Sequence, residues 1–134
     1  MTASLPLAES PDCRIAEPPT TQGIARLARE GINNVGLVYN LHHGHAHLDR
    51  FPALLEKMKP HLLALNLNGM TKGADAAGRK IMVLGAGEED ARLLRAIRDS
   101  RWHGPVGILN HTDEDAETRL AANLAGLEKL LTQP

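Results

Sequence analysis

Three runs of apolar residues along the chain lack the polar alternation of a half-exposed strand. They cover residues 35–40, 62–68 and 106–110, and each ends in an asparagine. Strands that are buried on both faces, as in a parallel sheet, have continuous apolar sequences of this kind. We therefore expect three buried parallel strands, with a shorter extended segment at residues 81–84.

Helical spacing of apolar residues separates these runs and predicts helices near residues 23–30, 51–58 and 88–100. Asp49 is the expected N-cap of the second helix, and Pro60 should end it. A last helix should begin at Thr112 or Asp113. Its expected apolar stripe consists of four leucines, Leu120, Leu124, Leu127 and Leu131.

Strands that alternate with helices indicate an α/β fold with a parallel sheet and right-handed crossovers. We expect an irregular N-terminal segment over residues 1–22, which is rich in Pro, Ser and Thr, and one domain over residues 23–134. A closed (β/α)₈ barrel usually needs about 250 residues. The chain has 134, so a barrel-type fold would be a partial one, with about three to four parallel strand–helix units.

Charge and cysteine content narrow the function. With 15 basic and 16 acidic residues, the chain lacks the basic excess of a nucleic-acid-binding protein. The single cysteine, Cys13, excludes an internal disulfide and a zinc site built from cysteines. No apolar run approaches the length of a membrane span, and the N-terminus lacks a secretion signal. We therefore expect no membrane partner and a cytoplasmic location.

Polar residues gather where the three expected strands end. They are Asn40, Asn66, Asn68, Asn110 and His111. Ligands of parallel α/β folds bind at the carboxyl ends of the strands, so these side chains are candidates for a shared substrate pocket. The alternative is ordinary capping of the strand ends, where asparagine is common.

Histidines form the sharpest local feature, because four of the seven lie within residues 42–47. Imidazole titrates near neutral pH and is the commonest metal ligand. His43 and His45, spaced by two, could bind one metal ion from an extended segment. The alternative is a solvated loop in which only one histidine has a function.

Two segments carry a resemblance to a known family. The strings VGLVYNLHHGHAHLDRFPALLEKMKPHLLALNLNGM and LGAGEEDARLLRAIRDSRWHGPVGILNHT resemble the C-terminal part of the sugar-phosphate isomerase/epimerase family, within the xylose-isomerase-like TIM-barrel superfamily. The likeness covers about residues 31–131. It implies that the three strands are the last three of eight and that the substrate is a small sugar or sugar phosphate. It also implies a divalent metal ion, Mg, Mn or Zn, as cofactor.

The resemblance assigns roles residue by residue. The family's metal-binding aspartate and the histidine three residues later fall on Asn40 and His43. Its next histidine falls on Asn66 or Asn68, and its final glutamate falls on Asn110. Only His43 keeps the family's residue type, so weak or no binding of Mg²⁺ or Mn²⁺ is expected. The catalytic base would be His43 or His45, because no matched carboxylate remains.

Two other functions stay open. One is a non-catalytic carbohydrate-binding or vestigial barrel domain that has lost the metal site. The other is a transition-metal-binding protein that uses His43 and His45. A truncated barrel would also leave its outer strands unpaired, and such edges favour association with a second copy of the chain.

Overall fold

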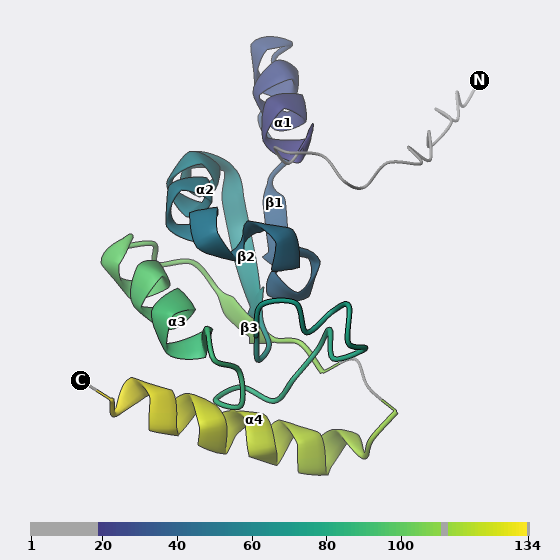
Figure 1. The fold of residues 1–134 in the computed structure, drawn as a ribbon. Coiled ribbons are helices and arrows are strands. Elements are labelled where there is room, and N and C mark those ends of the chain that lie inside the picture. The colour runs from purple at the N-terminus through teal and green to yellow at the C-terminus, as the bar shows by residue number, and fades with distance from the viewer. Residues whose placement is uncertain (1–18, 111–112, 134) are drawn as a thin grey trace.

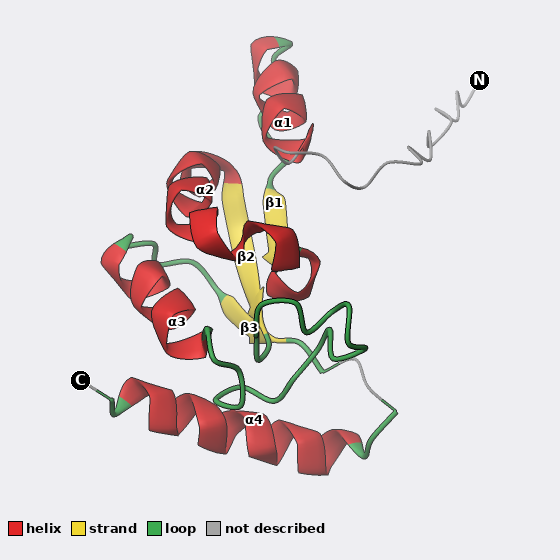
Figure 2. Ribbon diagram, viewed as in Figure 1, coloured by secondary structure: helices red, strands yellow, loops and turns green. Residues whose placement is uncertain are grey.

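The computed structural model describes residues 19–110 and 113–133 (Figures 1 and 2). Four helices alternate with three strands: α1 (Pro19–Arg29), β1 (Leu37–Asn40), α2 (Phe51–Met58), β2 (Leu62–Leu67), α3 (Asp90–Asp99), β3 (Val106–Ile108) and α4 (Ala116–Leu131). Short 3₁₀ turns, η1 (Leu41–His43), η2 (His45–Arg50) and η3 (Lys59–His61), flank α2. The helix α1 begins at Pro19, so the expected boundary between residues 22 and 23 falls inside it.

The strands form one open three-stranded sheet in the order β1-β2-β3. Both pairings are parallel, with Asn40 opposite Asn66 and Asn66 opposite Gly107. The prediction of an α/β fold with parallel strands is therefore confirmed. The sheet of the described residues is open and has three strands, which is compatible with the predicted partial array of strand–helix units.

One face of the sheet carries the hydrophobic core. Leu65 and Leu67 of β2 are buried, and they pack with buried residues of α2 and α3, which lie along the same side of the sheet (Figure 1). Tyr39 of β1 faces the same layer, since its ring lies 6.0 Å from the ring of Phe51 in α2. Aliphatic packing thus supplies nearly all of this core.

The other face of the sheet is open among the described residues. Side chains alternate along a strand, so Val38 and Asn40 point away from the layer that Tyr39 contacts. Val38 is 55% exposed, and Asn40 and Asn66 are half-buried. The sequence pattern predicts strands covered on both faces, and the described chain supplies a cover for one of them.

Two local predictions about strands need correction. The strands are shorter than the apolar runs, because β1 begins at Leu37 and β3 ends at Ile108. The expected extended segment at residues 81–84 forms no strand; Met82 makes a single antiparallel bridge to Gly69. This segment folds back on the end of β2 after a long loop, so it runs against the strand instead of extending the parallel sheet.

Both predicted helix caps that fall on described residues are wrong. Asp49 lies within η2, and Arg50 is the N-cap of α2. The Asp49 carboxylate instead forms an ion pair with Lys72. The cap of α4 is Asp115, whose Oδ2 accepts a 2.8 Å hydrogen bond from the backbone N–H of Thr118. The alternative cap Thr112 lies outside the described residues.

The face of α4 that contacts the protein also differs from the prediction. Leu120 and Leu124 are about half exposed, whereas Asn123 is 1% exposed. Asn123 Oδ1 accepts a 2.9 Å hydrogen bond from the N–H of Leu84, and its Nδ2 donates to the carbonyl of Arg119 at 3.0 Å. A polar side chain thus anchors the helix, and the predicted leucine stripe lies largely outside the core.

No helix among the described residues is both long and apolar enough to span a lipid bilayer.

Candidate functional site

An amide pair joins the carboxyl ends of β1 and β2. Asn66 Nδ2 donates a 2.7 Å hydrogen bond to Asn40 Oδ1. On its other side, Asn66 Oδ1 lies above Gly107 of β3, where an added Cβ would be 2.3 Å away. Glycine at this position therefore leaves room for the Asn66 amide. The three strands place Asn40, Asn66 and Gly107 in one row across the open face of the sheet.

The other predicted substrate-binding asparagines have local backbone partners. Asn68 is 1% exposed, and its Nδ2 donates to the carbonyl of Gly69 at 2.9 Å. Asn110 Nδ2 donates to the carbonyl of Ala116 at 3.4 Å. Among the described residues, neither amide hydrogen-bonds to Asn40 or Asn66. His111, the remaining predicted binding residue, lies outside the described residues.

His43 is the exposed residue of η1, and its ring lies 3.8 Å from the ring of the buried His42, centroid to centroid, at a tilt of 42°. Partial desolvation lowers the pKa of His43 below its usual 6.5, and the ammonium of Lys80 lowers it further. The imidazole is therefore neutral at neutral pH and can accept a proton. A group of this kind can serve as a general base.

His45 has a different environment, because its side chain is only 5% exposed. Its Nε2 lies 2.9 Å from the backbone carbonyl of Lys80. A carbonyl can only accept, so Nε2 carries the proton and a neutral ring keeps its lone pair on Nδ1. That Nδ1 lies 3.8 Å from Oδ1 of Asp75, on the loop after β2.

The histidine cluster does not converge on one point. His47 Nδ1 accepts a 3.1 Å hydrogen bond from Arg50, while His43 and His45 have the separate surroundings described above. Over residues 19–110 and 113–133, no group of three or more His, Cys, Asp or Glu side chains is placed to hold a metal ion.

The metal ion that the family resemblance implies does not fit the residues present. Of the expected ligand atoms, Asn40 Oδ1 already accepts a hydrogen bond from Asn66 Nδ2, and the other asparagine positions offer only neutral amide oxygens. Amides also bring no negative charge to offset a hard divalent cation. Only His43 would contribute a ligand of the family's type.

Unused hydrogen-bonding capacity gathers at the same end of the sheet. Buried side-chain atoms without a hydrogen-bond partner among the described residues include Tyr39 Oη, His45 Nδ1, Asn68 Oδ1 and Asn110 Oδ1. All four atoms belong to residues near the carboxyl end of a strand or in the segment that follows it. Burial raises the pKa of Tyr39 to about 12, so its hydroxyl stays protonated as a donor. An unpaired buried polar group costs roughly 1–3 kcal/mol, so each of these atoms favours a polar partner.

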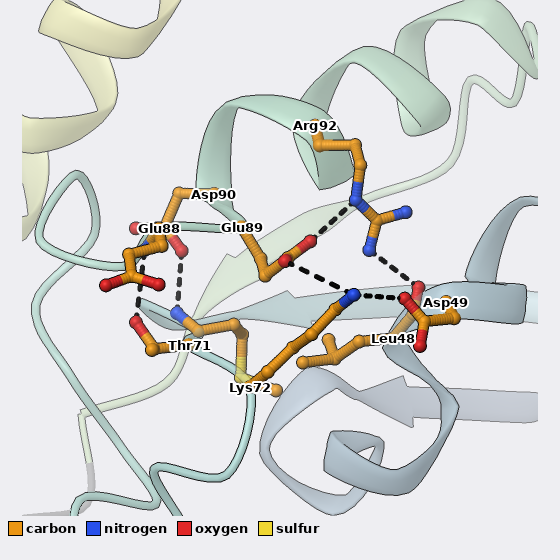
Figure 3. Close-up of polar contacts among 9 residues, drawn as sticks. Leu48, Asp49, Thr71, Lys72, Glu88, Glu89, Asp90 and Arg92 are labelled. Atoms are coloured by element: carbon orange, nitrogen blue, oxygen red, sulfur yellow. Dashed lines mark hydrogen bonds and ion pairs between the residues drawn. The ribbon is translucent and has the colours of Figure 1, made fainter.

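A charged network fixes the loops around this end (Figure 3). The Lys72 ammonium pairs with Asp49 of η2 and lies 3.9 Å from Glu89 Oε1. Arg92 of α3 donates to Glu89 at 2.6 Å and to the carbonyl of Leu48 at 2.7 Å. The Lys72 ammonium lowers the pKa of Asp49 through a hydrogen bond and its charge. These contacts tie the loops that follow β1 and β2 to the start of α3.

Asp90 fixes the connection between β2 and α3 from the inside. Its buried carboxylate accepts hydrogen bonds from the N–H groups of Met70 at 2.6 Å, Gly85 at 2.7 Å and Gly87 at 3.0 Å. Burial raises its pKa, and the three N–H donors act in the opposite direction. Asp90 is therefore a structural carboxylate.

Sequence reasoning missed Asp75, Asp90 and Tyr39. An aspartate just after a Gly-Ala-Gly turn, in the first turn of a helix, is a usable signal for the loop-binding role of Asp90. Asp75 gave no such signal, because it is far from His45 in the chain and lies in a loop without apolar periodicity. Tyr39 belongs to the apolar run 35–40, and the pattern of that run predicts only a buried strand.

No protein-family model, curated protein or solved structure matches the chain.

Proposed function

We propose that this protein binds a small sugar or sugar phosphate at the carboxyl ends of β1 and β2. The observation that carries the proposal is the Asn40–Asn66 pair, half-buried on the open face of the sheet. After their mutual hydrogen bond, Asn40 Nδ2 remains a donor and Asn66 Oδ1 remains an acceptor. Each sugar hydroxyl both donates and accepts, so a neighbouring hydroxyl pair can use both groups.

The surroundings of the pair support a polar, compact ligand. Gly107 adds no side chain beside Asn66, and the loops after β1 and β2 are braced by the Lys72 and Asp90 contacts. When the protein groups that contact a ligand are already held in place, less conformational entropy is lost on binding. The position also agrees with the strand-end location of ligands in parallel α/β folds.

Isomerisation of the bound sugar is the catalytic form of this proposal. His43 follows Asn40 by three residues, and its lowered pKa keeps it neutral and able to accept a proton. It would take the proton from the carbon next to the carbonyl group and return it to the former carbonyl carbon, while the proton of the neighbouring hydroxyl passes to the former carbonyl oxygen, so that an enediol forms and then collapses to the isomer. Asn40 Nδ2 would donate to the oxygen on which negative charge develops. The non-catalytic alternative uses the same amide pair without proton transfer.

Ligand-observed NMR with a panel of aldoses, ketoses and their phosphates tests the binding proposal. We expect one sugar class to bind the parent chain and to lose at least about tenfold in affinity in Asn40→Ala and Asn66→Ala. Asn33→Ala is the matched control, because Asn33 is an exposed asparagine away from the strand ends. If no sugar binds, or if all three variants behave alike, the proposal is wrong.

The same sugars in D₂O separate catalysis from binding. Deuterium uptake at the carbon next to the carbonyl group, lost in His43→Gln with binding retained, would establish His43 as the base. Binding of a sugar without any exchange would establish the non-catalytic alternative.

A further inference from the structure

The imidazole of His45 is oriented as metal-binding histidines usually are. Such histidines donate the ring N–H that faces away from the metal to a carbonyl or carboxylate, which fixes the tautomer. His45 Nε2 lies 2.9 Å from the Lys80 carbonyl, and the Asn68 amide approaches the same oxygen at 3.5 Å. The Nδ1 lone pair is thereby held in place on a side chain that is 5% exposed.

A carboxylate faces that lone pair. Asp75 Oδ1 lies 3.8 Å from His45 Nδ1, which is too long for a hydrogen bond. Zinc binds imidazole nitrogen at about 2.0–2.1 Å and carboxylate oxygen at about 2.0–2.2 Å. An ion between the two atoms would therefore be reached by both, with a bent nitrogen–metal–oxygen angle.

The loop that carries Asp75 is held by its own backbone. The N–H of Gly78 donates to the Asp75 carbonyl at 3.1 Å, and the N–H of Arg79 donates to the Ala74 carbonyl at 2.7 Å. Ala74 is buried, and Gly73 and Gly78 supply the positive φ angles of 70° and 74° that the turns require. The backbone at Asp75 thus has a defined position, from which the carboxylate reaches within 3.8 Å of His45 Nδ1.

We propose that His45 Nδ1 and the Asp75 carboxylate bind a zinc-type transition-metal ion. Imidazole and carboxylate together suit Zn²⁺ and Co²⁺, and one negative charge offsets part of the charge of the ion. Two protein ligands leave the remaining coordination positions to water or to an oxygen of a bound ligand. The site is distinct from Asn40, Asn66 and His43, so it does not depend on the proposed sugar binding.

Calorimetry with ZnCl₂ and visible absorption with CoCl₂ test the site on the full chain without any sugar. We expect binding of one ion and a Co²⁺ spectrum typical of nitrogen and oxygen ligands. Asp75→Asn should weaken Zn²⁺ binding at least about tenfold, and His45→Gln should abolish it. Because Asp75 is about half exposed, its variant tests the proposal even if His45→Gln fails to fold.

His47→Gln is the matched control, since Arg50 already donates to His47 Nδ1. Its Zn²⁺ affinity should stay within about twofold of the parent. The proposal is overturned if the parent binds no Zn²⁺, which would leave His45 and Asp75 as a simple ion pair. It is equally overturned if Asp75→Asn keeps the parent affinity, or if binding is lost in His43→Gln and retained in His45→Gln.

Discussion

A methyl group added at Gly107 would lie 2.3 Å from Asn66 Oδ1, so the size of the residue in β3 controls the orientation of the amide in β2. The nearest atom is the end of a side chain, and Asn66 can rotate away from it. We therefore expect Gly107→Ala to fold with a stability loss of about 1 kcal/mol, but with the Asn40–Asn66 hydrogen bond broken. Sugar affinity should fall about tenfold although both amides are present.

The control for this substitution is Gly23→Ala in α1, where no atom lies within 4 Å of the added Cβ. Alanine within a helix should raise stability by about 0.5–1 kcal/mol and leave sugar binding unchanged. Urea denaturation and ligand-observed NMR measure the two effects. An unchanged sugar affinity in Gly107→Ala would show that the orientation of Asn66 is irrelevant to the ligand.

The charge of Lys80 should be visible in the titration of His43. Desolvation is the larger cause of the lowered His43 pKa, and the Lys80 ammonium is the second. Lys80→Met should therefore raise the pKa part of the way back toward 6.5. The ring-proton chemical shifts of His43 between pH 4 and 8 measure this change.

Arg79→Met is the control, because it removes a neighbouring positive charge that is not a cause of the lowered pKa of His43. The pKa of His43 should stay unchanged in this variant. A lowered pKa also has a consequence for stability, because the unfolded chain binds the proton more readily than the folded one. The contribution of His43 is complete above pH 6.5 and is lost as the pH falls through its folded-state pKa. No shift in Lys80→Met would place the ammonium too far from the ring to matter.

Self-association is expected from the two outer strands. The strands β1 and β3 each have one partner in the described sheet, and Val38 and Val106 are 55% and 49% exposed. Unpaired edges with apolar side chains favour pairing with another chain, and a lysine there opposes it. Light scattering should show concentration-dependent association of the parent and a shift toward monomer in Val38→Lys. A parent that stays monomeric at every concentration would contradict this expectation.

The sequence predicts the parallel sheet well because a continuous apolar run has few other interpretations. It also predicts that Asn40 and Asn66 lie together, since parallel strands end at the same edge. The sequence does not predict the partner of Asp49, because a capping preference is weak and the ion pair with Lys72 depends on how a distant loop folds. The proximity of His45 and Asp75 is unpredictable for the same reason, because the two residues lie on loops that follow different strands.

In helix α4 the sequence pattern predicts the wrong buried face. Leucines at heptad-like spacing predict an inward stripe, but helical periodicity cannot tell which face of a helix meets a neighbour when a polar anchor competes. Gly126 lies so close to the backbone of Leu84 that an added Cβ would overlap with the Leu84 carbonyl oxygen. This close contact turns Asn123 inward and leaves Leu124 half exposed.

The relative cost of two alanine substitutions in α4 tests that arrangement. Asn123→Ala removes the acceptor for the Leu84 N–H and the donor to the Arg119 carbonyl, both at a buried position. It should lower the free energy of unfolding by about 1–3 kcal/mol, although alanine has the higher helix propensity. Leu124→Ala removes a half-exposed side chain and should cost about 0.5 kcal/mol or less. Urea denaturation of the two variants decides the question, and a larger loss for Leu124→Ala would mean that α4 docks through its leucine stripe.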